Sequence, residues 1–263
     1  MGFFGRKRAP SVPHPRKEPR FDGPLTLERL EQIFQDCVDF TKRPVSLGEG
    51  GACTLTLCYL SGMVKMERVS DYVLRPLAQD EALARCGTPR QAMDRMKDGA
   101  LYNLSAEERT RLDAAVFDLV NGCCLLLFPW ESSVLSLNVG TEEKRSISSP
   151  SNETVLKGSR DAFVESLRTN TSIVRRHLKA PELRIREQVV GRQSVTSVDI
   201  LYIEGLTNPH LVEQVAAQLA DIDIDAVLTT GNIEEYIVPA ARTAFPLVQY
   251  TERSDRFCAG LAE

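Results

Sequence analysis

Residues Val195 to Tyr236 carry the clearest signal of the fold and read VTSVDILYIEGLTNPHLVEQVAAQLADIDIDAVLTTGNIEEY. Residues 198–204 are apolar on nearly both faces of a period-2 pattern, which predicts a central β-strand covered by helices on two sides. Gly205 ends this strand, and Asn208 followed by Pro209 is typical of a helix N-cap and first turn. The apolar residues that follow recur at helical spacing and predict a helix that packs on the strand: Leu211, Val212, Val215 and Leu219. The stretch therefore indicates an α/β fold.

Working outward, similar patterns predict further strands and helices. Strand-like runs predict two hairpins with glycine in their turns and one antiparallel pair around a proline turn: 44–47 with 53–60, 183–190 with 194–203, and 123–128 with 134–139. Helical periodicity predicts four more helices: 26–40, 67–77, 105–121 and 161–178. Ser105 and Glu108 have the spacing of a capping box, which places the start of the third of these helices.

The chain also repeats itself. Placing TLTLCYLSGMV over SVDILYIEGLT aligns Tyr59 with Tyr202 and Gly62 with Gly205, so the order helix, hairpin, helix occurs twice at an offset of 143 residues. This repeat predicts two similar α/β subdomains, each a small mixed sheet with flanking helices. We place the first subdomain at 23–145 and the second at 146–263, with the boundary inside the polar segment 141–158.

Residues 1–22 are predicted to be a disordered basic arm, because the first twenty hold six Lys or Arg against one Glu and four prolines. The arm either keeps the protein in solution or makes a weak electrostatic contact with an anionic membrane surface.

The repeat also predicts how the second subdomain ends. In the first copy a helix ending at Asn121 and Gly122 is followed at once by two strands. In the second copy TERSDRFCAGLAE takes the place of that helix, and a one-residue shift in register lays Leu119 over Leu261. We therefore expect the second subdomain to be truncated at its C-terminus, without the corresponding strand pair.

Several long motifs carry a resemblance to a known family. VDILYIEGLTNPHLVEQV, IDIDAVLTTGNIEEYI and YTERSD occur in this order, preceded by KGSRDAFVESLRTNTSIVRRHLKAPEL and VVGRQSVTSVDI. The chain resembles the N-terminal soluble region of the GerA-type spore germination proteins, the A subunits of germinant receptors, most strongly over residues 147–263. Ser254 stands where the family usually has proline, which would loosen that turn.

The resemblance implies a cytosolic domain at the inner membrane of the bacterial spore, followed in family members by a transmembrane region. Its implied partners are the other receptor subunits and sister A subunits, in a complex that senses nutrients and triggers ion release. A small-molecule nutrient is a further candidate ligand, and no cofactor is implied.

Composition excludes several classes of function. With 263 residues and 43% hydrophobic content the chain can bury a substantial core, but no run of 18 apolar residues could span a membrane. A net charge of −4 argues against nucleic acid as the main partner. The seven cysteines are odd in number and form no CxxC pair, which indicates reduced, buried thiols rather than disulfides or a metal site.

No catalytic or metal-binding constellation stands out. The histidines at 14, 177 and 210 lack metal-ligand spacing, and the chain contains neither a phosphate-binding loop nor a nucleophile elbow. Asp221, Asp223 and Asp225 alternate, but without the glycine and terminal glutamate of a calcium loop they indicate a solvated face. We therefore predict a protein that is not an enzyme and has no bound metal or cofactor.

Two functions remain open. The chain is either an assembly and signalling module of a receptor, or a small-molecule binding module that holds a germinant between its two subdomains. The candidate interaction surface comprises five charged residues: Arg160, Arg175, Arg176, Glu252 and Arg253.

Two features have alternative interpretations. The basic residues at 175–179 either complement a helix dipole or form a phosphate or lipid site. Trp130, in the turn after 123–128, either binds a partner or closes the end of a core.

Overall fold

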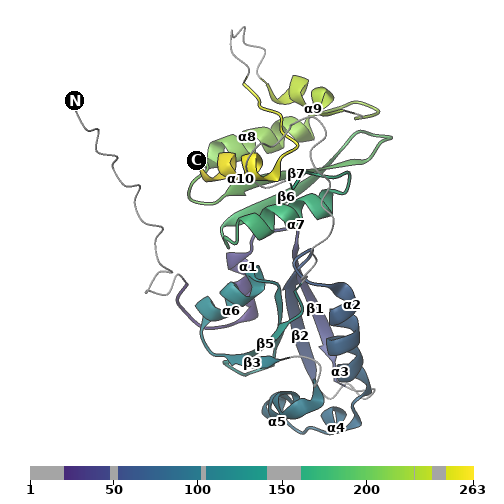
Figure 1. Ribbon diagram of the computed structural model, residues 1–263, viewed down its shortest axis with the longest axis vertical. Helices are drawn as coiled ribbons and strands as arrows, with labels where there is room; N and C mark the ends of the chain where they lie inside the picture. The colour runs from purple at the N-terminus through teal and green to yellow at the C-terminus, as the bar shows by residue number, and fades with distance from the viewer. Residues whose placement is uncertain (1–20, 48–52, 102–104, 141–160, 228, 239–246) are drawn as a thin grey trace, which may run out of the picture.

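The computed structural model consists of two α/β units that lie one above the other along the long axis of the molecule (Figure 1). It describes residues 21–47, 53–101, 105–140, 161–227, 229–238 and 247–263. The predicted basic arm falls outside the described residues except for its last two positions, and the predicted boundary segment at 141–158 falls outside them entirely. The limits of the two subdomains therefore remain predictions.

The first unit is built on a five-stranded sheet. Its strands are β1 (Phe40–Ser46), β2 (Thr54–Leu60), β3 (Ala106–Arg109), β4 (Cys123–Leu127) and β5 (Val134–Asn138), in the spatial order β1-β2-β4-β5-β3. All pairs in this sheet are antiparallel. The predicted α/β class is confirmed, but the described sheet is antiparallel rather than mixed, because β1 pairs with β2 and β4 with β5, each with the next strand along a short stretch of sequence.

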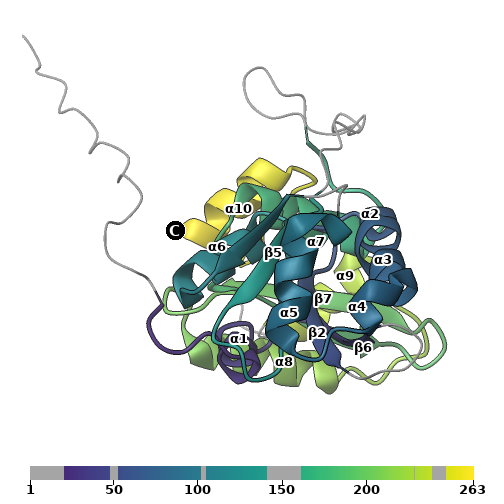
Figure 2. The ribbon, with the colours of Figure 1, turned by 90° about the horizontal axis from the view of Figure 1, so that it is seen from below.

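Helices cover both faces of this sheet (Figure 2). On one face lie α2 (Met66–Val69), the π-helical turn η1 (Ser70–Leu74), α3 (Arg75–Gln79), α4 (Glu81–Ala84), α5 (Pro89–Arg95) and η2 (Met96–Ala100). On the other lie α1 (Leu27–Ile33) and α6 (Leu112–Val120). Alternate residues of β4 enter the two cores, Leu126 on the first face and Leu125 on the second. This double burial is why β4 is apolar along its whole length.

The second unit is a hairpin between two pairs of helices. Its elements are α7 (Leu167–His177), β6 (Leu183–Val190), β7 (Thr196–Ile203), α8 (Pro209–Ala220), α9 (Thr230–Ile237) and α10 (Ser254–Ala262). Helices α8 and α9 pack on one face through Leu219 and Ile233, and α7 and α10 pack on the other through Val174 and Cys258. Among the described helices none is long and apolar enough to cross a membrane.

The hairpin corrects the prediction for the strand in the opening stretch. Within the described residues β7 pairs only with β6, and its residues from 198 to 203 are half-buried. Helices cover both faces of β7, as predicted, but it is not a central strand. Its apolar pattern reports the two covering layers and carries no information about neighbours in the sheet.

Three helix boundaries also differ from prediction. Helix α1 keeps Thr26 as its N-cap but ends at Ile33, because Asp36 takes a left-handed φ of 56° and the chain then turns into β1. Residues 106–109 form β3 instead of a first helical turn, and α6 begins at Leu112. Helix α7 begins at Leu167 rather than 161, because Ala162 pairs with the backbone of Arg253.

The internal repeat is visible in the backbone. Gly62 and Gly205, which the sequence alignment superimposes, end β2 and β7 with φ angles of 80° and 81°. Helices α6 and α10 each have nine residues and start at Leu112 and Ser254, which agrees with the predicted one-residue shift. The two units thus share the order helix, hairpin, helix, and the first unit adds β3, β4 and β5 to its sheet.

Candidate functional site

The two units meet through a backbone contact between the end of α1 and β6. The amide of Val38 donates to the carbonyl of Ile185 at 2.9 Å, and the amide of Ile185 donates to the carbonyl of Asp36 at 3.1 Å. Cys37, which belongs to no named strand, therefore forms a parallel bridge with Ile185 of β6. This contact continues the pairing of β6 into the first unit.

A buried ion pair lies beside this bridge. Arg175 of α7 is 1% exposed and donates two hydrogen bonds to Asp39, from Nε to Oδ2 at 2.8 Å and from Nη2 to Oδ1 at 2.9 Å. Nη2 also lies 3.4 Å from Sγ of Cys37. Such a bidentate pair has a defined geometry, and removing one partner would leave an uncompensated buried charge. The pair therefore fixes α7 against the start of β1.

A second arginine joins the same junction. Nη1 of Arg184 on β6 donates to the carbonyls of Ile33 at 2.7 Å and Pro181 at 2.9 Å, and its Nη2 pairs with Glu204. Because Ile33 is the last residue of α1, a cation from the second unit satisfies a free carbonyl at the end of a helix in the first. We call the contact made by Cys37, Asp39, Arg175, Arg184 and Ile185 the inter-unit junction.

The junction changes the interpretation of the predicted interaction surface. Arg175 is not a surface residue, because it is buried against Asp39. Arg176 is exposed at the end of α7, and Arg160 lies outside the described residues. Glu252 accepts a backbone hydrogen bond from Phe163 at 2.8 Å, and Arg253 pairs with Asp255 at 2.6 Å, so both lie at the entry to α10.

The basic end of α7 has internal partners. Besides Arg175, Nζ of Lys179 donates to Oδ1 of Asn121 at 2.9 Å, and Nε2 of His177 lies 3.4 Å from Asp161. These contacts favour a structural role for the basic residues over a phosphate or lipid site.

His177, Asp161 and Ser254 resemble a hydrolase triad only in composition. Oγ of Ser254 lies 3.3 Å from Nε2 of His177, and the same nitrogen faces Asp161. In a catalytic triad the serine and the aspartate contact different ring nitrogens, and the serine is reachable by substrate. Here Ser254 is 0% exposed. This cluster therefore has a structural role.

Ser254 does not loosen its turn. It stands at the first position of α10, where proline is favoured for its fixed φ. Serine gains two hydrogen bonds to the carbonyl of Asp161 instead, from its amide at 3.3 Å and from its hydroxyl at 3.0 Å. The expectation that serine loosens this turn is therefore wrong, because Ser254 is held by the carbonyl of Asp161.

The remaining candidate residues are placed as follows. All seven cysteines are free thiols, and burial raises the pKa of Cys58 to about 12 and that of Cys258 to about 11. Asp223 pairs with Arg192 at 2.7 Å. Within the described part of the chain, no group of three or more His, Cys, Asp or Glu side chains could hold a metal ion.

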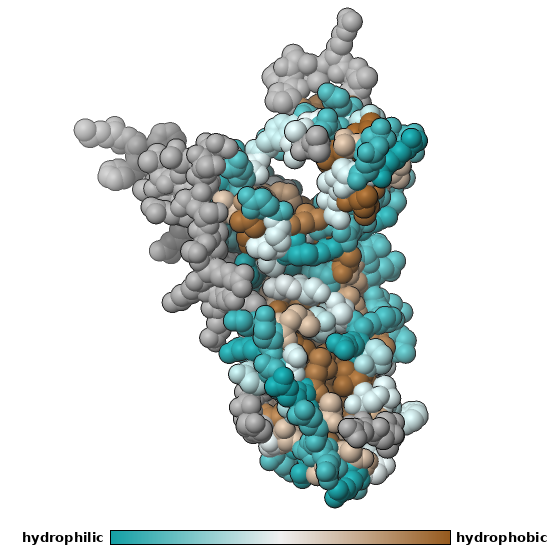
Figure 3. Space-filling model, turned by 90° about the vertical axis from the view of Figure 1, so that its right-hand side faces the viewer, coloured by the Kyte–Doolittle hydropathy of each residue, from teal (hydrophilic) through white to brown (hydrophobic). Residues whose placement is uncertain are grey.

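Trp130 does not close the end of a core, because it is 98% exposed. On the face of the molecule shown in Figure 3, hydrophobic residues form separate small groups between hydrophilic ones. Among the large hydrophobic residues that the structure describes, Trp130 is the most exposed, which favours the binding interpretation of this residue.

Sequence reasoning missed Asp39, Cys37 and Arg184. Asp39 stands between two apolar residues where a helix gives way to a strand, and Arg184 alternates with buried residues of β6. A charged residue inside an apolar pattern is the one local signal that could have indicated them. Their partners lie more than 130 residues away in the sequence, so no local sequence pattern could indicate the pairing.

Comparison with known proteins shows which family this chain matches. Residues 28–263 match the family model described as Bacillus/Clostridium GerA spore germination protein. "Uncharacterized membrane protein YfkQ" of Bacillus subtilis (strain 168) is 32% identical over 237 residues, 90% of this chain and 45% of that protein. "Spore germination protein KA" of the same organism is 31% identical over 225 residues, 86% of this chain and 41% of that protein. The chain thus spans less than half the length of these relatives.

One solved structure has the same fold. The crystal structure of the N-terminal domain of the A subunit of the Bacillus megaterium spore germinant receptor GerK3 superimposes with a TM-score of 0.69 and 24% identity, covering 92% of this chain and 90% of that one. The family match over nine-tenths of the chain and the shared two-unit fold agree, and the chain belongs to the GerA family of Bacillus and Clostridium spore germination proteins.

Proposed function

We propose that this chain is the cytosolic N-terminal domain of a spore germinant receptor A subunit, acting in receptor assembly and signalling during nutrient-triggered germination. Family membership and the fold shared with the N-terminal domain of the GerK3 receptor A subunit support the receptor assignment. The proposed partners are the other receptor subunits and sister A subunits. The proposed location is the cytosolic face of the spore inner membrane, with a following transmembrane region as the anchor.

The inter-unit junction is the observation that carries the signalling role. Packed side chains, hydrogen bonds and ion pairs that join two units can couple a displacement of one unit to the other. The bidentate pair of Arg175 and Asp39 and the backbone bridge at Ile185 couple the units through side chains and main chain at once. A displacement of the second unit is then passed to the first sheet through β1, which begins one residue after Asp39.

Nutrient binding between the units is the alternative, and the junction does not favour it. The described side chains where the units meet fill the space with a buried ion pair and a thiol. Three hollows formed by described residues, beside Trp130, Tyr202 and Phe257, each lie on a single unit. Calorimetry against a panel of amino acids and sugars tests this alternative. A saturable heat of binding that is lost when Asp39 is replaced would support nutrient binding between the units.

Germination of spores tests the proposal. Spores would carry the receptor with Asp39→Asn, or with Asp22→Asn as a matched control at an exposed position. We expect Asp39→Asn to slow nutrient-triggered germination and Asp22→Asn to leave it unchanged. Immunoblots of all receptor subunits separate the two roles: lost subunits indicate failed assembly, and retained subunits with slow germination indicate failed signalling. Normal germination of Asp39→Asn spores with normal subunit levels would contradict the signalling role.

A further inference from the structure

Trp130 is held in the turn between β4 and β5 under two unfavourable conditions. Its side chain is 98% exposed, and its backbone has a φ of 61°, in the left-handed region that non-glycine residues rarely occupy. A glycine or asparagine would suit this turn better, and a polar side chain would suit water better. An observed outlier of this kind points to a function outside the fold itself.

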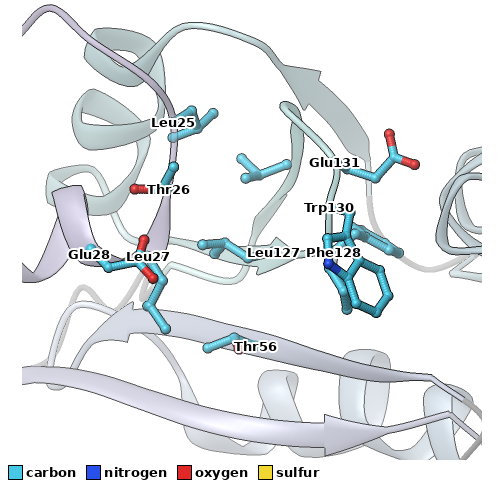
Figure 4. A pocket seen from close by; sticks show the side chains of 11 residues that line it. Leu25, Thr26, Leu27, Glu28, Thr56, Leu127, Phe128, Trp130 and Glu131 are labelled. Carbon is cyan, nitrogen blue, oxygen red and sulfur yellow. The ribbon is translucent and has the colours of Figure 1, made fainter.

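The indole borders a hollow of about 400 Å³ on the α1 side of the sheet (Figure 4). Its walls come from the start of α1, from β2 and from the β4–β5 turn, and they are largely apolar. Leu25, Leu127, Phe128 and Val134 are each buried in the cores beneath, so the floor of the hollow is formed before anything binds. We call this surface the Trp130 hollow.

The lining of the Trp130 hollow carries negative charge. The described residues that line the hollow include two carboxylates, Glu28 and Glu131, and no lysine or arginine. Figure 4 shows Glu28 and Trp130 on opposite sides of the hollow, with Glu131 next to Trp130. Hydrogen bonding to its own backbone amide and to Thr26 lowers the pKa of Glu28, so this carboxylate is ionised at neutral pH.

We propose that the Trp130 hollow docks a basic segment of a partner protein, in which the aliphatic stem of an arginine or lysine enters the hollow and its cation faces the indole. The electron-rich face of an indole attracts such cations, and the two carboxylates add complementary charge. The size of the hollow suits one or two long side chains rather than a whole helix.

A protein partner accounts for the exposure of Trp130 better than a free amine does. A small amine inside the hollow would touch one edge of the indole and leave most of it in water. Tryptophan is enriched among the residues that dominate protein interfaces, because a partner surface can cover both its faces. This inference rests on the proposed assembly role for the nature of the partner, but docking is measurable on the isolated chain without any germination assay.

The test uses a short synthetic peptide as the probe, with two arginines separated by leucines. Because the chain contains one tryptophan, fluorescence reports on Trp130 alone. We expect the arginine peptide to shift the emission saturably. Matched peptides with glutamine or glutamate in place of arginine should bind at least about tenfold more weakly, the scale of a desolvated cation–π contact. Equal binding of the three peptides would overturn the proposal.

Variants of the chain locate the site by calorimetry. Trp130→Gly relieves the left-handed backbone, so it should keep the fold while weakening the arginine peptide at least tenfold, about the contribution of one anchoring side chain. Glu28→Gln combined with Glu131→Gln should also weaken it, whereas Glu67→Gln, at an exposed position elsewhere, should not. Unchanged binding to a folded Trp130→Gly variant would overturn the proposal. Tighter binding of a peptide of residues 1–20 would overturn it too, because the chain's own arm would then be the occupant.

Discussion

Arg175 donates two of its hydrogen bonds to Asp39, at a place where almost no water reaches either group. In such a place the attraction between the charges is offset by their loss of hydration, so the pair adds little stability over an apolar contact. Its effect is on specificity, because the two groups satisfy each other in one geometry. Burial also raises the pKa of the neighbouring Cys37 thiol against the opposing effect of Arg175, so the thiol stays neutral beside the pair.

Replacing Arg175 should therefore be far more damaging than replacing its neighbour. We expect Arg175→Met to lower the free energy of unfolding by about 3 kcal/mol, because Asp39 would remain buried without a partner. Arg176→Met, at the exposed next position, should change it by less than about 0.5 kcal/mol. Chemical denaturation of both variants measures the difference. Similar values for the two would show that Asp39 finds water when Arg175 is absent.

The sequence indicated the wrong environment for Arg175 for a physical reason. Cations at the C-terminal end of a helix are usually solvent-exposed, and the local pattern around 175–179 is the same whether the helix end faces water or another unit. By contrast, the buried cysteines were predictable, because Cys58 and Cys124 stand inside apolar runs whose burial the run itself indicates.

At the scale of elements, one carboxylate joins β3 to its neighbouring elements. Glu108 of β3 accepts hydrogen bonds from Arg90 of α5 at 2.6 Å, Lys97 of η2 at 2.7 Å and Ser133 of the β4–β5 turn at 2.8 Å. These bonds, that from Arg90 first, lower its pKa from 4.5 to about 2. The capping-box spacing of Ser105 and Glu108 could not reveal this, because the same residue types satisfy distant groups equally well.

The stability contributed by Glu108 should depend on pH. Its pKa is lower in the folded chain than in the unfolded one, so the contribution is complete above about pH 4.5 and is lost as the pH falls toward 2. We expect Glu108→Gln to lower the melting temperature near neutral pH and to differ less from the wild type as the pH falls through this range. Glu107→Gln, at the exposed neighbouring position, is the control. A difference that is independent of pH would mean that packing, and not charge, anchors β3.

The two repeat-related glycines offer a matched pair. Gly62 and Gly205 have the same φ, but a Cβ on Gly62 would lie 2.8 Å from Cβ of Ser172 in α7, whereas one on Gly205 would meet nothing within 4 Å. We expect Gly205→Ala to cost about 1 kcal/mol of stability for the backbone alone. Gly62→Ala should cost about 1–3 kcal/mol more, because α7 must move. Thermal or chemical denaturation compares them, and equal costs would mean that α7 adjusts without resistance.

Hairpins were predictable at this scale because alternation and turn glycines are local signals, and the β6–β7 and β4–β5 pairs have the predicted partners. Which strand pairs with the edge of a sheet depends on residues far apart in the sequence, so no local signal reveals it. The apolar pattern of β7 therefore predicted its covering helices correctly and its place in the sheet wrongly.

At the scale of the whole molecule, the repeat predicted two similar units but not how they touch. Gly62 approaches α7, Asp39 pairs with Arg175, and Arg184 caps α1, so each contact joins a turn or helix end of one unit to an element of the other. Turns and helix ends carry no periodic pattern, so the junction could not be predicted from the sequence. The first unit has five strands between two helical layers, and the second has two. The second unit should therefore be the less stable when it stands alone.

Cooperative unfolding tests whether the junction joins the units. We expect the wild-type chain to unfold in one calorimetric transition, because opening the second unit alone would expose Arg175 and Asp39 without their partners. Asp39→Ala removes the pair and leaves Arg175 as an uncompensated charge, so the second unit should separate and melt first, giving two transitions. Hydrogen exchange assigns them: amides of β6 and β7 should lose protection at lower temperature than those of β4 and β5. Asp22→Ala, at an exposed position just before the first unit, should keep a single transition. One transition in Asp39→Ala, shifted to lower temperature, would instead place the coupling in the backbone bridge between residues 36–38 and Ile185.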